Sequence, residues 1–192
     1  MDDVGAVAAK ARMRAQVRAA RAARTPVQRD DAAPALAAAV LALPELAGVP
    51  TVAAYASRPD EPGTAPLLAA LRERGCTVLL PCVVGQELQW GELDDTGLSP
   101  AAFGIDEPRG PRRSDLHGVD VVIAPALAVD AHGHRLGQGG GYYDRALADA
   151  RVPVIALVHD DEMVDEVPFE SHDLVVDIIV TPTRVVRVTP TS

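Results

Sequence analysis

The sequence predicts a three-layer α/β/α fold with a mostly parallel central sheet, preceded by an N-terminal helical arm. After the arm, short apolar runs alternate with helical segments, which is the pattern of βα units. Several of these runs, residues 121–126 among them, are apolar throughout, as is typical of strands covered on both faces. With 192 residues, 48% of them hydrophobic, and no internal repeat or linker, we expect a single domain over residues 1–192.

The arm is predicted over residues 4–23, where Ala and Arg dominate and no Pro occurs. Four basic residues at spacings of four, four and three share one face of this helix: Lys10, Arg14, Arg18 and Arg21. Like charges on one face repel, so the face is mildly unfavourable unless an anion or an acidic surface covers it. The alternative is a face that is merely solvated.

The second helix is expected to begin at Thr25-Pro26, an N-cap followed by Pro at the first helical position. It contains the apolar run 36–43, and Pro34 is expected to kink or restart it. The remaining elements follow from apolar runs bounded by turn residues. We expect strands over residues 51–56, 77–84, 88–93, 120–126, 152–158, 175–181 and 185–188, and helices over residues 66–74 and 142–150. Residues 94–118 are expected to form a long surface excursion, with 88–93 at a sheet edge.

Charge and composition exclude several classes of partner. The net charge of −9 argues against nucleic acid and anionic membranes, and six aromatic residues are too few for a base-stacking surface. Residues 1–29 nevertheless carry +5, so a basic arm faces a body of −14. The first residues lack the features of a secretory signal and no stretch is long enough to span a membrane, so we expect a cytoplasmic protein without an obligate protein partner. Cys76 and Cys82 are expected to be reduced packing residues.

Lys10 is the only lysine, since the other 17 basic residues are arginine. A sequence that uses arginine wherever it serves suggests that this position needs an ammonium group, which is a compact point charge that fits between phosphate oxygens. The alternative is a chance survival at an exposed position.

The most informative segment is residues 133–145, with four glycines in the five residues 137–141. Glycines between a strand and a helix let the backbone approach an anion closely, and free N–H groups at a helix start can bind phosphate. The segment lacks the lysine of a Walker loop and the third glycine of the dinucleotide fingerprint, where Tyr142 stands. An unusual turn is the alternative, although it would not require the flanking Arg135, Tyr143 and Asp144.

In this segment the sequence resembles the 5-formyltetrahydrofolate cyclo-ligase family, also called 5,10-methenyltetrahydrofolate synthetases. Residues 135–144 match the family signature Arg-Leu-Gly-x-Gly-x-Gly-Tyr-Tyr-Asp throughout, and the resemblance covers nearly the whole chain. Further matches are Lys10 with Arg14, Tyr55-Ala56-Ser57 with Glu61 and Thr64, Pro81, Phe103 to Pro108, Asp120 to Pro125, Asp130 with Gly133, Pro168 to Asp173, and Val176 to Thr181. Departures from the family pattern are Glu162, Thr181-Pro182, Ala126, Ala128 and Val129. We expect them to alter details of pterin or adenine recognition.

The resemblance implies an ATP-driven cyclisation of 5-formyltetrahydrofolate to 5,10-methenyltetrahydrofolate, with ADP and phosphate as the other products. In such a reaction the formyl oxygen attacks the γ-phosphate, and N10 then captures the phosphorylated iminium. Phosphoryl transfer of this kind depends on positioning and charge neutralisation. The implied ligands are the two small-molecule substrates, 5-formyltetrahydrofolate and ATP, together with Mg²⁺.

The resemblance also implies the site residues. The catalytic groups would be Lys10, Arg14, Arg135 and Tyr143. ATP would be bound by Lys10, Arg14, Arg135, Leu136, Gly137, Gln138, Gly139, Gly140, Gly141, Tyr142 and Tyr143. The folate would be bound by Ala56, Glu61, Gln138, Gly139, Gly140, Gly141 and Tyr142. Carboxylates suit Mg²⁺, so Asp144 and Asp173 would bind the metal.

Each of these residues also has a plainer interpretation. Glu61 could be a solvated loop carboxylate, Asp144 a helix cap and Asp173 an ordinary loop acid. The two tyrosines could be core rings, and the pair His132 and His134, without further ligands, is usually a surface feature rather than a metal site. At the level of function, the alternatives are a non-catalytic nucleotide- or folate-binding regulator of the same fold and a sugar-phosphate isomerase, for which no acid/base pair is evident.

Overall fold

The central sheet is built around five parallel strands in the computed structural model, which describes residues 3–101, 104–170 and 173–189. The parallel strands are β2 (Thr77–Val84), β1 (Thr51–Ala53), β7 (Val121–Pro125), β10 (Val154–Leu157) and β11 (Ile178–Val180), in that spatial order. Antiparallel strands extend both sides: β12 (Val185–Arg187) beside β11, and β3 (Glu87–Glu92) and then β6 (Arg112–Arg113) beside β2. Two small hairpins pair β4 (Leu98–Pro100) with β5 (Asp106–Pro108) and β8 (Ala128–Val129) with β9 (Arg135–Leu136).

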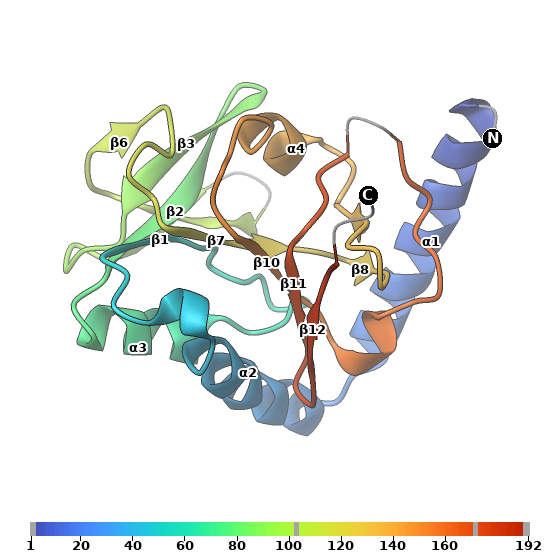
Figure 1. The fold of residues 1–192 in the computed structure, drawn as a ribbon, viewed down its shortest axis with the longest axis horizontal. Helices are drawn as coiled ribbons and strands as arrows, with labels where there is room; N and C mark the ends of the chain where they lie inside the picture. Colours follow the sequence, from blue (N-terminus) through green and yellow to red (C-terminus); the bar gives the residue numbers. More distant parts are fainter. Residues whose placement is uncertain (1–2, 102–103, 171–172, 190–192) are drawn as a thin grey trace.

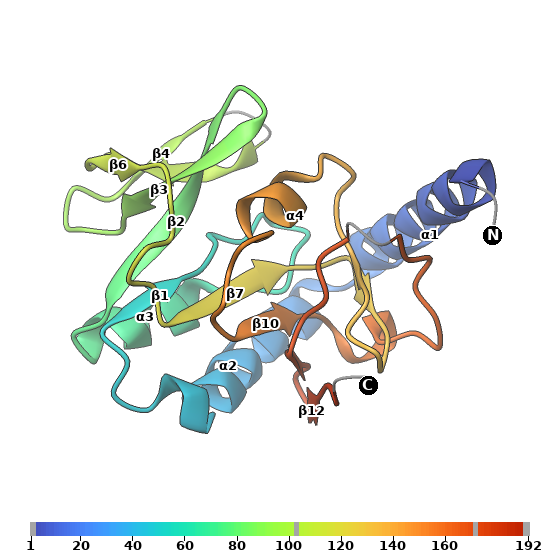
Figure 2. The same cartoon turned by 45° about the horizontal axis from the view of Figure 1, so that its top comes forward.

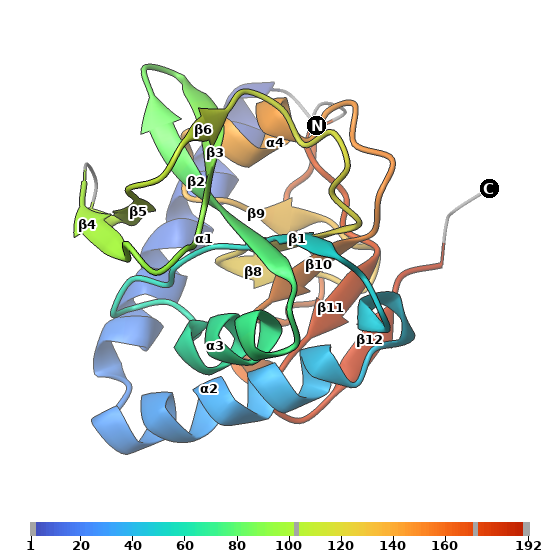
Figure 3. The same cartoon turned by 90° about the vertical axis from the view of Figure 1, so that its left-hand side faces the viewer.

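Helices cover both faces of this sheet. The helices α2 (Pro26–Leu41) and α3 (Ala65–Glu73) lie under one face, and α4 (Tyr142–Ala146) lies over the other (Figures 1 and 3). The arm helix α1 (Asp3–Ala23) stands at one end of the molecule. Short 3₁₀ turns occur at Pro44–Leu46 and Asp160–Glu162. The expected layered α/β fold with a mostly parallel sheet and an N-terminal helix is therefore confirmed.

The sheet core has two sides because successive strand residues point to opposite faces. On the α2–α3 side, Val52 and Ile123 pack with Leu36 of α2 and Leu71 of α3, all of them buried. On the α4 side, Trp90 lies in the second buried cluster, together with Ala53, Val122 and Leu147. This burial on both faces explains why β7, β10 and β11 in the middle of the sheet are apolar throughout.

The second helix begins where the sequence predicts and ends at Leu41, two residues before the end of the apolar run 36–43. The hydroxyl of Thr25 accepts from the backbone N of Gln28 at 3.3 Å, and the Gln28 side chain accepts from the backbone N of Thr25 at 2.9 Å, which completes a capping box. Pro34 lies inside one helix, so a restart there is wrong. Pro34 removes the N–H partner of the Asp30 carbonyl, and Asp30 is exposed, so water can replace that partner.

Outside residues 102–103, which the structure does not describe, the segment 94–118 contains strands and is not only a surface excursion. It contributes the β4–β5 hairpin and β6, and β6 pairs with β3, so β3 is not an edge strand. The cause is Glu107, a buried carboxylate that accepts from the backbone N of Val83 at 2.8 Å and pairs with Arg112 at 3.1 Å. Figure 2 shows β2 and β3 reaching past β1 toward these strands.

Several predicted elements are shorter than expected. The helix predicted over residues 142–150 ends at Ala146, and the strands predicted over 51–56 and 175–181 reduce to β1 and β11. Cys76 and Cys82 are both free, as expected, and Cys82 is buried. No helix within the described residues has the length and apolarity needed to cross a membrane.

Candidate functional site

The glycine-rich loop, residues 137–141, leaves the β8–β9 hairpin and enters α4. The β8–β9 hairpin lies between this loop and the strand predicted over residues 120–126. Two positions require glycine because their φ angles are positive, 107° at Gly139 and 63° at Gly141. A side chain on Gly140 would lie 2.7 Å from the ring of Tyr142. The loop therefore adopts its path only because these positions carry no side chain.

A pocket of about 480 Å³ opens on one side of this loop, at the carboxyl ends of β1, β2 and β7. This is the end of a parallel sheet at which ligands commonly bind. Much of its wall is apolar and includes Pro81, Val83, Leu88, Ile105 and Leu127. It also brings together ten residues predicted for the site: Ala56, Glu61, Arg135, Gly137, Gln138, Gly140, Gly141, Tyr142, Tyr143 and Asp144. A flat apolar ring system fits such walls, and the polar groups can fix its orientation.

Glu61 reaches the pocket from a loop that is locked by hydrogen bonds after β1. The hydroxyl of Thr64 donates to the carbonyl of Tyr55 at 2.7 Å and accepts from the backbone N of Ser57 at 3.0 Å. Within this loop the Glu61 carboxylate accepts from the backbone N of Arg58 at 3.0 Å and pairs with the Arg58 guanidinium at 3.2 Å. Glu61 is thus a held group on the pocket wall, not the solvated loop carboxylate of the plainer interpretation.

Tyr143 carries a buried hydroxyl group for which no hydrogen-bond partner exists among the described residues. Burial raises the pKa of this hydroxyl far above its usual value, and the negative charge of Glu61 raises it further, against the effect of Arg135. It therefore stays protonated at neutral pH and can donate a hydrogen bond to a ligand. The ring meets Trp90 edge-on, with centroids 6.1 Å apart. Tyr143 and Tyr142 both pack on the core as well as line the pocket, so neither is a core ring only.

Arg135 is buried, and hydrogen bonds from both terminal nitrogens of its guanidinium hold it in place. One nitrogen donates to the carbonyl of Pro125 at 3.0 Å and the other to the carboxylate of Asp144 at 2.7 Å. Its Nε is buried and unpaired within the described part of the chain. Arg135 thus presents positive charge at the pocket with one donor still available.

The opposite side of the loop faces α1. Lys10 is buried, and its ammonium group donates to Glu170 and to Asp173, each at 2.5 Å. Burial disfavours the charged form, but these carboxylates outweigh it and raise the pKa of Lys10 above its ordinary value. Arg14 donates from Nε to the carbonyl of Gly137 at 2.9 Å, and its guanidinium lies against Gly139. Burial and the nearby charge of Arg18 lower the pKa of Arg14.

The predicted site residues therefore form two groups that meet at the loop. Lys10, Arg14, Leu136, Gly139 and Asp173 lie outside the pocket wall. The basic face of α1 is covered by the glycine-rich loop and by acidic residues of the C-terminal part of the chain, so it is not a merely solvated face. In Figure 1 the orange segment before residue 171 runs beside α1.

The two candidate metal ligands both accept hydrogen bonds from cations. Asp144 Oδ1 accepts from Arg135 and from the backbone N of Leu174 at 3.1 Å, and it does not cap α4, whose N-cap is Gly141. Asp173 Oδ2 accepts from Lys10 and from the backbone N of Glu170 at 2.8 Å. No group of three or more His, Cys, Asp or Glu that could hold a metal ion is found in the described ranges.

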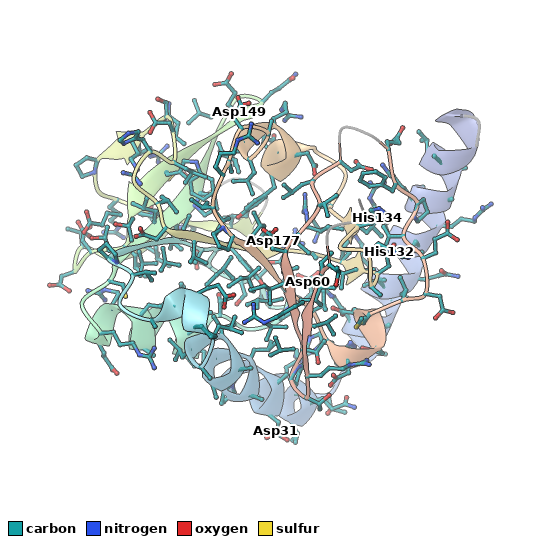
Figure 4. The ribbon with its side chains drawn as sticks, in the orientation of Figure 1. Asp31, Asp60, His132, His134, Asp149 and Asp177 are labelled. Atoms are coloured by element: carbon teal, nitrogen blue, oxygen red, sulfur yellow. The ribbon has the colours of Figure 1, made fainter. Side chains whose placement is uncertain are left out.

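His132 and His134 lie at the β8–β9 hairpin (Figure 4). His134 Nδ1 is 2.9 Å from Asp130 Oδ2, and its ring stacks on Phe169 with centroids 4.1 Å apart. The carboxylate of Asp130 also accepts from the backbone N of His132 and of Val167. The two histidines therefore belong to a structural cluster. Phe103 and His172 lie outside the described residues.

The acidic groups that pair with the basic face of α1 were not predicted from the sequence. Arg21 is only 1% exposed, and it donates to both carboxylate oxygens of Glu162, each at 2.8 Å, and to the carbonyl of Ala126 at 2.7 Å. Glu162 was expected to affect ligand recognition. It instead pairs with Arg21 in the last turn of α1 and does not line the pocket. Glu170, the second partner of Lys10, was matched only as part of a motif. The only signal for these pairs was the opposite charge of the arm and the body.

Comparisons with known proteins show the family to which the chain belongs. Residues 6–182 match the model of the 5-formyltetrahydrofolate cyclo-ligase family. The chain is 44% identical over 144 residues to a 5-formyltetrahydrofolate cyclo-ligase of Mycolicibacterium smegmatis, covering 70% of this chain and 74% of that protein. It is 32% identical over 178 residues to that of Escherichia coli, covering 88% and 98%. The solution structure of Aquifex aeolicus 5,10-methenyltetrahydrofolate synthetase superposes with a TM-score of 0.84 at 28% identity, covering 95% of this chain and 94% of that one.

Proposed function

The chain belongs to the 5-formyltetrahydrofolate cyclo-ligase family, and from that premise we propose that it uses ATP to convert 5-formyltetrahydrofolate to 5,10-methenyltetrahydrofolate. The products would be methenyltetrahydrofolate, ADP and phosphate, within one-carbon folate metabolism. One observation carries the proposal for the site. The glycine-rich loop borders the pocket through Gly140 and Gly141 and contacts Arg14 through Gly137 and Gly139. A folate in the pocket and a nucleotide along the basic helix would meet across this loop.

The pocket side would bind the folate. Its apolar walls suit the pterin ring, and the carboxylate of Glu61 can accept hydrogen bonds from pterin N–H groups. Ala56, Gln138 and the ring of Tyr142 line the same space. The pterin would therefore be held by its edge at Glu61 and by its faces against the apolar wall.

The loop and α1 would bind ATP. Backbone N–H groups of residues 136–141 can cradle phosphate oxygens, because glycine lets the chain approach them closely. Lys10, Arg14 and Arg135 would supply the positive charge for the triphosphate, and Tyr143 would supply a neutral donor. The full nucleotide-binding set is the predicted one, extending from Arg135 to Tyr143 with Lys10 and Arg14.

The reaction requires two successive substitutions. The formyl oxygen attacks the γ-phosphorus, an O–P bond forms, and ADP leaves with the electron pair of the broken bond. N10 then attacks the formyl carbon, phosphate departs with its oxygen, and the N10 proton is lost, which leaves the methenyl bridge. The contribution of the protein is to hold formyl oxygen and phosphorus in line and to neutralise negative charge with Arg135 and Lys10. Tyr143 would donate to the oxygen that bears the developing charge.

Mg²⁺ fits the chemistry of the two carboxylates proposed for it. Asp144 and Asp173 offer oxygen ligands, and Mg²⁺ is usually bound by one or two carboxylates, with phosphate oxygens and water completing its shell. Both carboxylates accept hydrogen bonds from Lys10 or Arg135, so the proposed metal ligands lie beside the cations proposed for the triphosphate. The metal would supply further neutralisation of the triphosphate.

We propose that the protein is cytoplasmic, forms a single domain over residues 1–192 and acts on small molecules. The net charge of −9 disfavours nucleic acid as a partner. The proposal requires no membrane and no obligate protein partner, since the pocket and the basic face come from one chain.

The test is an absorbance assay for methenyltetrahydrofolate made from 5-formyltetrahydrofolate, with and without ATP. We expect product only with ATP and a divalent cation, and ATP hydrolysis only when the folate is present. Equal ATP hydrolysis without folate, or full activity in a chelator, would contradict the proposal.

A further inference from the structure

Arg18 is the one member of the basic face of α1 that reaches the pocket wall. A terminal nitrogen of its guanidinium donates twice to Gln138, at 3.1 Å to the backbone carbonyl and at 3.0 Å to the side-chain oxygen Oε1. Arg18 is exposed and was expected only as part of a basic stripe. These contacts assign it a specific neighbour in the middle of the glycine-rich loop.

The contact with Oε1 determines which way the Gln138 amide points. A guanidinium only donates hydrogen bonds, so it must face the amide oxygen and leave the NH₂ group to point away. That NH₂ group lies 3.3 Å from the Glu61 carboxylate, which only accepts. A reversed amide would set NH₂ against the guanidinium and oxygen against the carboxylate, two unfavourable contacts. Arg18 and Glu61 thus allow one orientation of Gln138.

We infer that Arg18 is a positioning residue for the folate and acts through Gln138 on Glu61. This rests on the proposed function, in which Glu61 binds the pterin. Glu61 is held from one side by Arg58, at 3.2 Å, and from the other by Gln138. Arg18 keeps the second of these contacts in place, and through it α1, which carries Lys10 and Arg14, is connected to the folate pocket.

Removal of the guanidinium releases the amide. The Gln138 side chain can then rotate, and Glu61 loses its donor on that side while retaining Arg58. The carboxylate that remains is less well oriented, so the folate binds less tightly, whereas the ATP-binding groups Lys10 and Arg14 keep their own contacts. A loss of affinity for the folate alone would distinguish this positioning role from a general effect of the positive charge of Arg18 on both anionic substrates.

The test compares Arg18→Gln with Arg12→Gln, the same charge change at another exposed arginine of α1. Binding of 5-formyltetrahydrofolate is measured by calorimetry, and KM for each substrate by the methenyl assay. We expect Arg18→Gln to raise the Kd and KM for the folate about fivefold to tenfold, the size of one charge-assisted hydrogen bond in a partly solvated site. KM for ATP should change less than about twofold, and Arg12→Gln should change neither. Arg18→Lys should restore part of the affinity, since an ammonium can still donate to Oε1.

A second background shows whether Arg18 acts through Gln138. In Gln138→Ala, the further change Arg18→Gln should have little effect on folate affinity. A persistent fivefold loss there would mean that Arg18 contacts the folate itself and would overturn the inference, as would unchanged folate affinity in the single variant. An inactive wild-type protein would instead contradict the proposed function. Melting temperatures of all variants identify any loss of folding.

Discussion

The two sides of the glycine-rich loop are built by different means. The pocket side stands on β1, β2 and β7, whose strand pairing fixes the backbone that carries its walls. The α1 side is assembled by ion pairs between segments far apart in the chain, such as Lys10 with Asp173 and Arg21 with Glu162, 163 and 141 residues apart. One side is thus a product of the sheet and the other of charge pairing.

This difference has a consequence for binding. The pocket is an open cavity with polar groups in its wall, so the folate that we propose for it would enter without rearrangement of the sheet. On the α1 side, Lys10 is already paired with Glu170 and Asp173, so a phosphate would have to compete with them for it. The pocket is therefore preformed, whereas the proposed nucleotide binding would require Lys10 to exchange its partners. The predictions that follow test this division, from the largest effect to the smallest.

The largest effect is expected for Glu61→Gln on the pocket side. The variant loses a carboxylate that pairs with Arg58 and faces the pocket. We expect kcat/KM for 5-formyltetrahydrofolate to fall about 100-fold. A loss of this size corresponds to the free energy of one hydrogen bond to a charged group in a buried site. ATP affinity, measured separately with a nonhydrolysable analogue, should stay within about twofold. An equal loss for both substrates would remove the division between the two sides.

Lys10→Arg is the corresponding change on the α1 side. The charge is kept, but a planar guanidinium replaces an ammonium group that is buried between two carboxylates. We expect KM for ATP to rise about tenfold, with folate affinity and melting temperature nearly unchanged. Steady-state titrations of both substrates check this. An unchanged KM for ATP would mean that any cation serves at this position.

Asp144→Asn and Asp173→Asn test whether the paired carboxylates bind metal. Each variant keeps the size of the side chain and removes one anionic ligand, so the Mg²⁺ midpoint should rise about threefold to tenfold and turnover should fall. High Mg²⁺ should restore part of the activity. Titration of activity against Mg²⁺ measures both. Near-normal turnover with an unshifted midpoint in either variant would remove that residue from the metal site.

The smallest effect concerns stability and not chemistry. The fully buried carboxylate of Asp130 holds the hairpin from which the loop departs. Burial alone would raise its pKa, but hydrogen bonds from the Val167 backbone and from His134 outweigh this, so its pKa is lowered. Its stabilisation is therefore present above the pKa of the unfolded chain, about 4, and is lost as pH falls through the lower folded value.

Asp130→Asn should cost about 1 to 2 kcal/mol of unfolding free energy at pH 7 and lose less stability than the wild type on acidification. Urea unfolding at pH 7 and at about pH 3 measures both quantities. The control is Asp149→Asn, an exposed carboxylate after α4 that Figure 4 labels, which should keep the wild-type acid dependence. The same acid dependence in Asp130→Asn would show that this carboxylate is not the cause.

Sequence reasoning succeeded where the signals were local. The Thr25 cap, the Ala-rich α1 and the glycines that need positive φ are each set by a few neighbouring residues. The β8–β9 hairpin was missed because two-residue strands leave almost no periodic pattern. The partners of Lys10 and Arg21 could not be predicted by spacing, because a charge pair across 141 or more residues depends on the finished fold. The glycine-rich loop was therefore predicted, but its division into two sides was not.

The pairing of α1 with the C-terminal part of the chain also sets an order of events during synthesis. Lys10 leaves the ribosome 160 residues before Glu170. At about 5 to 20 residues per second, this is an interval of roughly 8 to 32 seconds. Throughout that time the basic face of the newly made helix lacks the acidic groups that will cover it. The proposed phosphate site is consequently among the last parts of the protein to be completed.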